Sequence, residues 1–489
     1  MLKKISSKVK FPSLIIELAN NSKNYSIGQI FLSGFGIITL PIFTRILSVE
    51  DYGIISIFLY TNSVLSVVFS LGIGQPINRY YYEKKQDFGS FLFTAILFLF
   101  LFQIAVFILG ILLLEQLESL VGLSRNLFLL AMCTSFFSPL VRAYQNLNIA
   151  MERSSSYSKF NIIRRMVLFA GSIMLIYVLP IEPYYSRVIG ELFIIPFFLY
   201  SFIQLRRIFT LSISLKHIKY ILKLCIPLYP PMLAGVIFGQ VDRVIINKYL
   251  GLTDTGLYSY AYTIGTLSGI FIVSISSSWT PKFMHYLKDK RFSLINNMTG
   301  LIIMLYCILI VSLILFCQEI SLVLAPDTFQ AGIIVTPIVL FASFFSSHET
   351  IYTNYVLFKK KLLFIMALIT ILIGMLKFGL NILLIPKFGY IAASYSLIIC
   401  YIVRLSGNYW LAKYLIGDSI YKLRYSYKPL LILIVALIIF YSLYISNISF
   451  LLRVFLKVVS LGLFIFVSYK IIKKQLNKIR SLELEYIKS

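Results

Sequence analysis

Apolar runs of roughly 20 residues recur along almost the whole chain, with short polar gaps between them, and this is the length that an α-helix needs to cross the ~30 Å hydrocarbon core of a bilayer. The mean hydropathy of +0.87 and the 59% of hydrophobic residues lie far outside the range of a water-soluble fold of 489 residues. The sequence therefore predicts a membrane protein without a separate soluble domain.

Hydropathy predicts fourteen membrane-spanning helices. The apolar segments are too long and too continuous for membrane β-strands, so we expect an all-α polytopic bundle. The segment before the first span has no short apolar core with a small-residue cleavage site, and we interpret it as a retained cytoplasmic tail. The expected spans are residues 24–45, 53–75, 90–114, 126–146, 163–180, 184–204, 224–247, 256–280, 294–316, 331–356, 362–384, 389–410, 429–446 and 450–470.

The net charge of +26 is distributed unevenly between the two sides of the predicted bundle. With both termini in the cytoplasm, most of the Lys and Arg residues fall in cytoplasmic segments, and the external loops are net acidic. This is the positive-inside pattern, and it explains the basic composition without a nucleic-acid partner. Anionic membrane lipids are the expected partner of such loops.

The cysteines give no sign of a metal or disulfide framework. All five lie in or beside predicted helices, without a CxxC or Cys/His spacing. We expect no metal and no bound cofactor, with coupling to H⁺ or Na⁺ as the alternative.

An internal repeat divides the chain. The segment TRILSVEDYG at 44–53 is similar to NKYLGLTDTG at 247–256. We infer two copies of a six-helix unit in one orientation, related by an axis along the membrane normal, with a cleft between them. The expected domains are 1–210, 211–415 and 416–489. The aligned pairs at an offset of 203 are Arg45 and Lys248, Leu47 and Leu250, Asp51 and Asp254, Gly53 and Gly256, and Ser56 and Ser259, and at 206 they are Pro180 and Pro386, and Tyr184 and Tyr390.

The same turn also has a local interpretation. Asp51 and Asp254 are placed to cap the helices that follow them, and Gly53 and Gly256 to ease the bend. This interpretation is compatible with the repeat.

Three stretches carry a family resemblance: IITLPIFTRILSVEDYGIISI, GIGQPINRYYYE and LCIPLYPPMLAGVIFGQVDRVIINKYLGLTDTGLYSYAYTIG. They resemble the polysaccharide transport family, the Wzx-type O-antigen and capsule flippases of the multidrug/oligosaccharidyl-lipid/polysaccharide exporter superfamily. Length and helix number agree over essentially the whole chain. The motifs are typical of the family and do not identify a substrate.

The resemblance implies a V-shaped bundle of two six-helix lobes plus two C-terminal helices, in a bacterial inner membrane. It implies a flippase, not an enzyme, that translocates undecaprenyl-pyrophosphate-linked oligosaccharide by alternating access for O-antigen or capsular polysaccharide. A polysaccharide polymerase and a chain-length regulator are the expected protein partners.

Charged residues within the spans are the candidate site, because a charge at mid-membrane costs several kcal/mol and needs a partner or a wet cavity. Arg142 ends a polar stripe on its predicted helix, and Lys377 and Arg404 lie on polar faces of theirs. We expect these three cations to line the cleft and to bind the lipid pyrophosphate. The alternative for Arg142 is that its side chain extends to the inner membrane surface.

Asp242 and Arg243 are adjacent, and neighbouring helical side chains point about 100° apart. We expect one of them to face the cleft and the other a neighbouring helix. Substrate contact and structural bracing are equally compatible with the pair.

Glu349 follows His348, and this pair is the candidate for ion coupling by a proton or by sodium. The alternative role of Glu349 is a salt bridge to Lys377 or Arg404. Arg187 and Glu191 are expected to form an i,i+4 pair near the outer surface, and Lys457 to extend outward.

Three other functions are weighed against the flippase. A lipid-dependent membrane enzyme needs catalytic carboxylates on a sizeable external loop, and these loops are short. A cation-coupled multidrug exporter of the same superfamily usually has twelve helices and an acidic cleft. A peptidoglycan lipid-precursor flippase has a basic groove as well, so charge does not exclude it.

Overall fold

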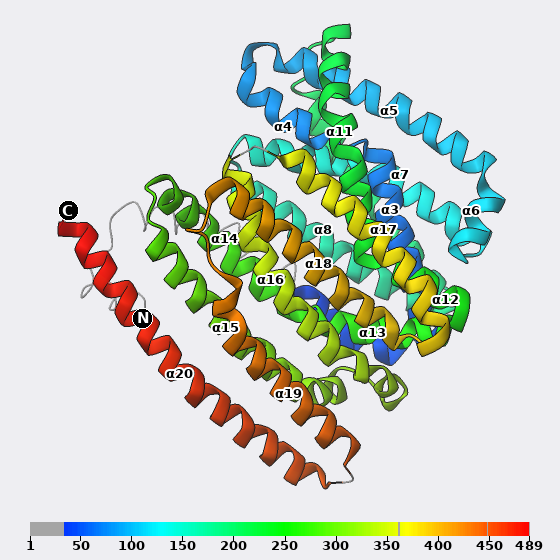
Figure 1. Cartoon of the computed structure of the whole chain (residues 1–489). Coiled ribbons are helices and arrows are strands. Elements are labelled where there is room, and N and C mark those ends of the chain that lie inside the picture. The colour runs from blue at the N-terminus through cyan, green and yellow to red at the C-terminus, as the bar shows by residue number, and fades with distance from the viewer. Residues whose placement is uncertain (1–33, 360–361, 447, 489) are drawn as a thin grey trace.

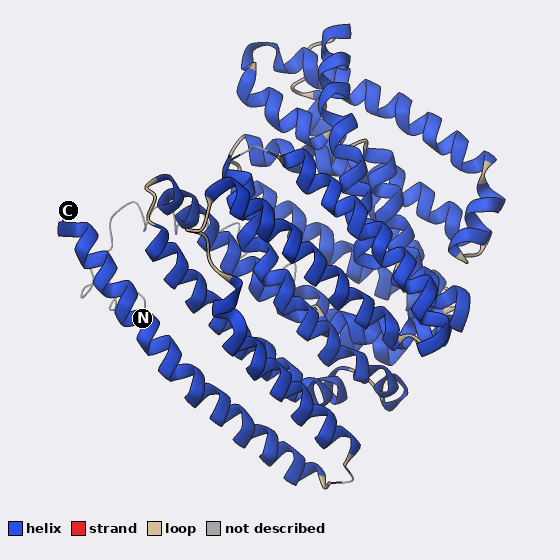
Figure 2. Cartoon of the chain, viewed as in Figure 1, coloured by secondary structure: helices blue, strands red, loops and turns tan. Residues whose placement is uncertain are grey.

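The computed structural model describes residues 34–359, 362–446 and 448–488, and within them the regular structure is helical (Figure 2). Thirteen helical stretches in these ranges are long and apolar enough to cross a membrane, and a shorter apolar helix, Gly34–Ile46, precedes them. The all-α polytopic class is therefore confirmed. The predicted tail and the start of the predicted first span lie outside the described residues.

The helices of the first half follow one another in the chain as Figure 1 shows. They are α3 (Val49–Ser70), α4 (Gly74–Glu83), α5 (Phe88–Leu112), α6 (Leu114–Val121), α7 (Arg125–Ala150), α8 (Ser154–Val178), α9 (Pro183–Ile189), the short helix η2 (Gly190–Phe193) and α10 (Ile194–Arg206).

The second half and the C-terminal helices continue the bundle. They are α11 (Leu215–Gln240), α12 (Asp242–Leu250), α13 (Leu252–Gly265), α14 (Leu267–Lys288), α15 (Phe292–Leu324), η3 (Asp327–Val335), α16 (Thr336–Lys359), α17 (Leu363–Phe388), α18 (Ile391–Ile416), α19 (Tyr427–Ile445) and α20 (Phe450–Lys488).

Most of the predicted spans have somewhat different bounds in the structure, and two of them illustrate why. The expected span 53–75 ends at Ser70, because Leu71 and Gly72 take positive φ values of 47° and 73° that stop the helix. The expected span 450–470 continues to Lys488 as one helix. Hydropathy marks only the apolar part of a helix, whereas backbone hydrogen bonds extend it into polar sequence.

Helices α3 and α13 cross in direct contact, and residues 203 apart in sequence meet there. Ser259 Oγ donates to Ser56 Oγ over 2.9 Å, and Thr253 Oγ1 donates to Glu50 Oε1 over 3.0 Å. Each bond joins a residue to its counterpart in the other copy of the repeat. Self-pairing of this kind is what a two-fold axis between the two helices produces.

The two repeat glycines, Gly53 and Gly256, allow this crossing. A Cβ atom on Gly53 would collide with the carbonyl oxygen of Leu252, and one on Gly256 with the carbonyl oxygen of Val49. The glycines therefore allow close packing of the two helices, and the easing of the bend that we expected of them stays a prediction. Small residues let membrane helices approach in this way.

The expected helix cap is confirmed in the first copy only. Ser48 and Asp51 form a reciprocal capping box at the start of α3. The corresponding α13 begins after Gly251, which has no side chain to cap it, and no capping bond from Asp254 is present there.

The C-terminal helices α19 and α20 pack against α15 (Figure 1). The expected outward extension of Lys457 is wrong. Its ammonium group binds both carboxylate oxygens of Glu319 on α15, at 2.8 and 2.9 Å, and the side chain is buried. This pair holds α20 against the bundle.

Candidate functional site

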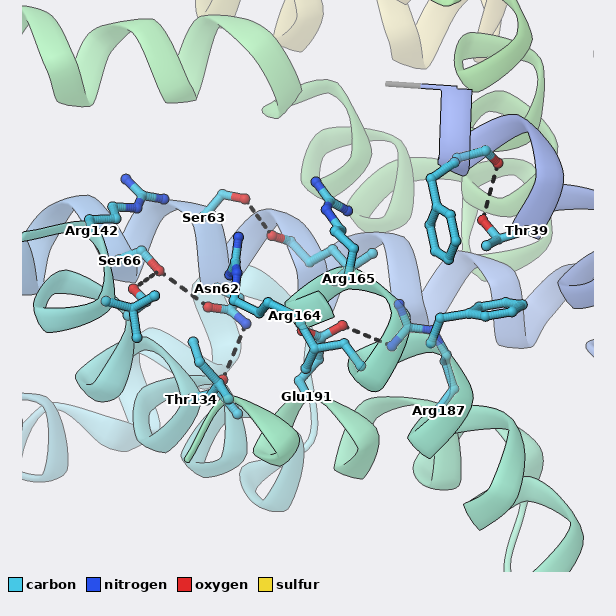
Figure 3. Close-up of a pocket in the computed structure, with 18 of the residues that line it drawn as sticks. Thr39, Asn62, Ser63, Ser66, Thr134, Arg142, Arg164, Arg165, Arg187 and Glu191 are labelled. Carbon is cyan, nitrogen blue, oxygen red and sulfur yellow. Dashed lines mark hydrogen bonds and ion pairs between the residues drawn. The ribbon is translucent and has the colours of Figure 1, made fainter. Parts of the chain in front are cut away.

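A cavity of about 470 Å³ lies among helices of the first half, as Figure 3 shows. Residues from the helix Gly34–Ile46, α3, α7, α8, α9, η2 and the start of α10 line it, and Gln240 at the end of α11 completes it from the second half. The cavity therefore lies beside the junction of the two copies.

Four arginines and one carboxylate line this cavity. Arg187 of α9 is paired with Glu191, with 2.8 Å between Nη1 and Oε1. Arg142 of α7 and Arg164 and Arg165 of α8 have no ion pair with a described residue, and the Nε of Arg164 is buried without a hydrogen-bond partner there. The cavity therefore carries an excess of three positive charges, which repel one another.

The wall beside Arg142 is polar and neutral. Asn62 of α3 donates to Thr134 Oγ1 over 3.2 Å, and Ser138 Oγ donates to Ser66 Oγ over 2.8 Å (Figure 3). The predicted polar stripe on α7 thus faces α3 and the cavity. Its amides and hydroxyls still have donors and acceptors to spare for a polyhydroxylated ligand.

The opposite wall is aromatic. Phe169 of α8 makes edge contacts with Phe35 and Phe43 of the helix Gly34–Ile46, with ring centroids 5.3 and 5.6 Å apart. All three rings line the cavity. Aromatic faces supply the flat apolar surface that the rings of sugars contact.

A second compartment of about 260 Å³ adjoins the main cavity. Arg187, Gln240 and Phe43 line both, so the two volumes share a wall of residues. The second compartment ends at the α3–α13 crossing, where Ser56 and Ser259 line it. Arg243 of α12 is its other cation.

Lys377 and Asp242, both expected in the cleft, form a sealed ion pair instead. Lys377 Nζ lies 2.9 Å from Asp242 Oδ2 and donates to the carbonyl oxygen of Phe238 over 2.6 Å, and both charged side chains are 0% exposed. Asn381 and Tyr258 donate to the same carboxylate, over 2.6 and 2.7 Å. Neither charged residue is among the residues that line the two compartments.

The adjacent residues Asp242 and Arg243 point in different directions, as expected. Asp242 faces α17 through Lys377 and Asn381, whereas Arg243 faces the second compartment. The angle between successive side chains of a helix is the physical reason.

Arg404 lies beside Glu349, with 3.4 Å between Nη2 and Oε1. Asn408 and Thr353 also donate to this carboxylate oxygen, each over 2.8 Å. Of the two alternatives for Glu349, the geometry thus contains the salt bridge to Arg404. Arg404 is not among the residues that line the two compartments.

His348 faces away from that carboxylate toward a different partner. Its Nδ1 lies 2.9 Å from the carbonyl oxygen of Phe344, and its Nε2 lies 2.8 Å from Ser426 Oγ. A coupling ion shared between His348 and Glu349 therefore has no direct contact between the two side chains to support it.

Sequence reasoning selected Arg142 and missed the other arginines of the main cavity. Arg164 and Arg165 fall at the start of a predicted span, where basic residues are ordinary membrane-surface anchors. Arg187 and Glu191 were expected at the outer surface as a self-neutralising pair. The available signal was the two adjacent arginines, Arg164 and Arg165, within an otherwise apolar helix.

Solved structures with a similar fold include a lipid flippase and a multidrug transporter. The lipid II flippase MurJ in an inward closed conformation has a TM-score of 0.68 at 19% identity, over 91% of this chain and 98% of that one. An outward-facing MATE-family multidrug resistance transporter of the MOP superfamily has a TM-score of 0.54 at 13% identity, over 82% and 96%. At these identities the likeness shows the fold alone.

A relative by sequence is the succinoglycan biosynthesis transport protein ExoT of Rhizobium meliloti (strain 1021). It is 20% identical over 266 residues, which is 53% of this chain. The match covers 52% of that relative, so the chain spans about half of its length.

The model of the polysaccharide biosynthesis protein family matches residues 18–287, more than half of the chain and all of the helices that build both compartments. The chain is therefore a member of the polysaccharide biosynthesis protein family, with the fold of MOP-superfamily transporters.

Proposed function

We propose that the protein is a flippase for lipid-linked oligosaccharide, and that the arginine-lined cavity receives the anionic head group. The observation that carries the proposal is the excess of guanidinium over carboxylate groups in the main cavity. The cargo that we propose is an undecaprenyl-pyrophosphate-linked repeat unit of an O-antigen or capsular polysaccharide. A polymerase and a chain-length regulator would act on the product.

The charge of the cavity fits such a head group. A lipid pyrophosphate carries about two negative charges, and moving it through hydrocarbon without compensation is prohibitive. Arg142 and Arg165 have no carboxylate partner among the described residues, and Arg164 interacts with Glu191 only through space, without a direct ion pair, so these arginines are available to an incoming anion. Guanidinium groups bind phosphate oxygens through two parallel hydrogen bonds.

The glycan would occupy the neutral part of the same cavity. Asn62, Ser63 and Gln145 offer hydrogen bonds to hydroxyl groups, and Phe35 and Phe169 offer flat apolar surface. The polyprenyl tail would stay in the surrounding lipid. This division keeps the polar part of the cargo in water and the apolar part out of it.

The transport cycle that we propose is alternating access between two lobes, residues 1–210 and 211–415, with 416–489 as an appended pair of helices. The α3–α13 crossing would close the outer end, because it joins the lobes by backbone-close packing. Opening would separate Ser56 from Ser259. The orientation that we propose, with both termini in the cytoplasm, is supported by the positive-inside pattern, and the inner-membrane location that we propose is the one implied by the family resemblance.

The remaining charged groups have other roles in this proposal. The Asp242–Lys377 pair braces α12 against α17, and Arg404 holds Glu349. Ion coupling at Glu349 and His348 would require protons or sodium to displace Arg404 or Ser426, respectively. A cation-coupled drug exporter is less favoured, because a cationic ligand would meet the arginines of the main cavity.

A peptidoglycan lipid-precursor flippase is the second candidate, and its support is the fold likeness to MurJ. Its cargo has the same kind of pyrophosphate, so the arginines serve both functions equally well. Deletion of the gene in its host organism distinguishes the two candidate functions. Loss of surface polysaccharide with normal cell shape on deletion supports the oligosaccharide flippase, and lysis supports the precursor flippase.

The test of the main proposal is complementation of such a deletion with cavity variants. We expect the double variant R142Q/R165Q to reduce surface glycan at least about tenfold, since two charged contacts are worth more than 1.4 kcal/mol together. The matched control is R207Q, an exposed arginine that is absent from the lining of both compartments. Wild-type glycan from a normally inserted double variant would overturn the head-group assignment.

A further inference from the structure

Arg243 places a nearly buried positive charge in the second compartment. Its side chain is 7% exposed, and its Nη1 is buried without a hydrogen-bond partner among the described residues. The guanidinium carbon lies 4.8 Å from the centroid of the Tyr262 ring. A buried charge with an unused donor is costly, so a partner is expected at this position.

The acids near Arg243 are already engaged. Asp242, its neighbour in sequence, has both carboxylate oxygens occupied by Lys377, Asn381 and Tyr258. Glu191 is paired with Arg187 and lines the main cavity rather than this compartment. The described lining of the second compartment therefore holds two guanidinium groups and no carboxylate.

The rest of this lining consists of groups that suit an anionic, hydroxylated ligand. Gln240, Ser56, Ser259 and Thr263 supply hydrogen-bonding groups beside Arg243. Arg187, which is paired with Glu191, lines both compartments, so one guanidinium group stands between the three unpaired arginines of the main cavity and Arg243.

We infer that the second compartment is a separate anion subsite, built on Arg243, that binds a carboxylate or phosphate group of the cargo. The inference rests on the proposed flippase function. The anion has two candidate sources. One is an acidic substituent of the glycan that is bound while the pyrophosphate occupies the main cavity, and the other is the pyrophosphate itself after it has passed Arg187.

Calorimetric titration of the purified full-length protein in detergent tests the subsite. The probes are inorganic pyrophosphate, glucuronate and, as the neutral control, glucose. We expect R243Q to weaken the binding of at least one anion about tenfold and to leave the glucose response unchanged. The arginine outside both compartments, in R207Q, gives the matched control.

A second arm distinguishes the sources. Simultaneous binding of glucuronate and pyrophosphate, with only glucuronate weakened in R243Q, assigns the subsite to an acidic glycan. Competition between the two probes, with pyrophosphate weakened in R243Q, assigns it to the travelling pyrophosphate.

Two outcomes overturn the subsite. One is that R243Q binds both anions as the wild type does. If R243Q does not fold, R243K takes its place, because lysine keeps the charge but lacks the planar set of donors of arginine. The second outcome is then that R243K binds both anions as the wild type does. Failure of the flippase proposal would be seen separately, as normal surface glycan in R142Q/R165Q cells.

Discussion

The first and second halves of the chain share a hydroxyl contact between corresponding helices. In the first half, Ser138 of α7 donates to Ser66 of α3 over 2.8 Å. In the second, Ser268 of α14 donates to Ser343 of α16 over 2.9 Å. The serines correspond at offsets of 202 and 205, close to those of the sequence repeat.

The cavities beside these two contacts differ in charge. The first-half cavity has four arginines, whereas the second-half cavity, of about 250 Å³, has only neutral residues in its described lining, among them Ser268, Ser343 and Tyr401. The second half keeps its intramembrane cation Lys377 in a closed ion pair. The two halves thus share a hydroxyl contact between helices and differ in the charge of the cavity beside it.

The comparison shows that a charge in a membrane span is not by itself a ligand site. Lys377 is the most deeply buried of the expected cleft cations, and Asp242 and the carbonyl oxygen of Phe238 bind its ammonium group. Arg165, which sequence reasoning passed over, is exposed to the cavity. Availability to a ligand depends on which partners the fold provides.

The largest effect is expected when the Asp242–Lys377 pair of the second half is broken. We expect K377M to lower the free energy of unfolding by about 3–5 kcal/mol, because it leaves the Asp242 carboxylate buried without its cation. Thermal unfolding of the purified protein measures this loss. The double variant D242N/K377M should recover most of the stability, and no recovery would contradict the pairwise interpretation.

A smaller loss is expected where the halves cross. G256A should destabilise the protein by about 1–3 kcal/mol, because the added methyl group meets the carbonyl oxygen of Val49. The matched control is G239A, at a helical glycine where an added methyl group would have no heavy atom within 4 Å. Equal melting temperatures for the two variants would mean that the α3–α13 contact is looser than described.

The smallest effect concerns the single carboxylate of the first-half cavity. We expect E191Q to raise the affinity for inorganic pyrophosphate about threefold, since Arg187 loses its partner and the cavity gains positive charge; threefold is about 0.7 kcal/mol. Calorimetric titration measures the change. Weaker binding in E191Q would indicate that Glu191 positions Arg187 for the anion rather than competing with it.

The sequence predicted the fold better than the site for a physical reason. Span positions depend on local hydropathy, and the polar stripe on α7 with Arg142 depends on helical periodicity, so both follow from residues close together in the chain. The different directions of Asp242 and Arg243 follow from helix geometry in the same way. The pairing of Lys377 with Asp242 joins residues 135 apart, and no local pattern contains it.

The sequence by itself determined that this is a helical membrane protein, because apolar length is a property of the chain alone, and its internal similarity predicts a duplicated unit. The tertiary structure decided which cations are neutralised and which are free. Lys377 and Arg404 meet carboxylates across helix contacts, while Arg142, Arg164 and Arg165 meet a cavity. That outcome depends on how the helices pack, because the cost of a buried charge depends on the partners around it.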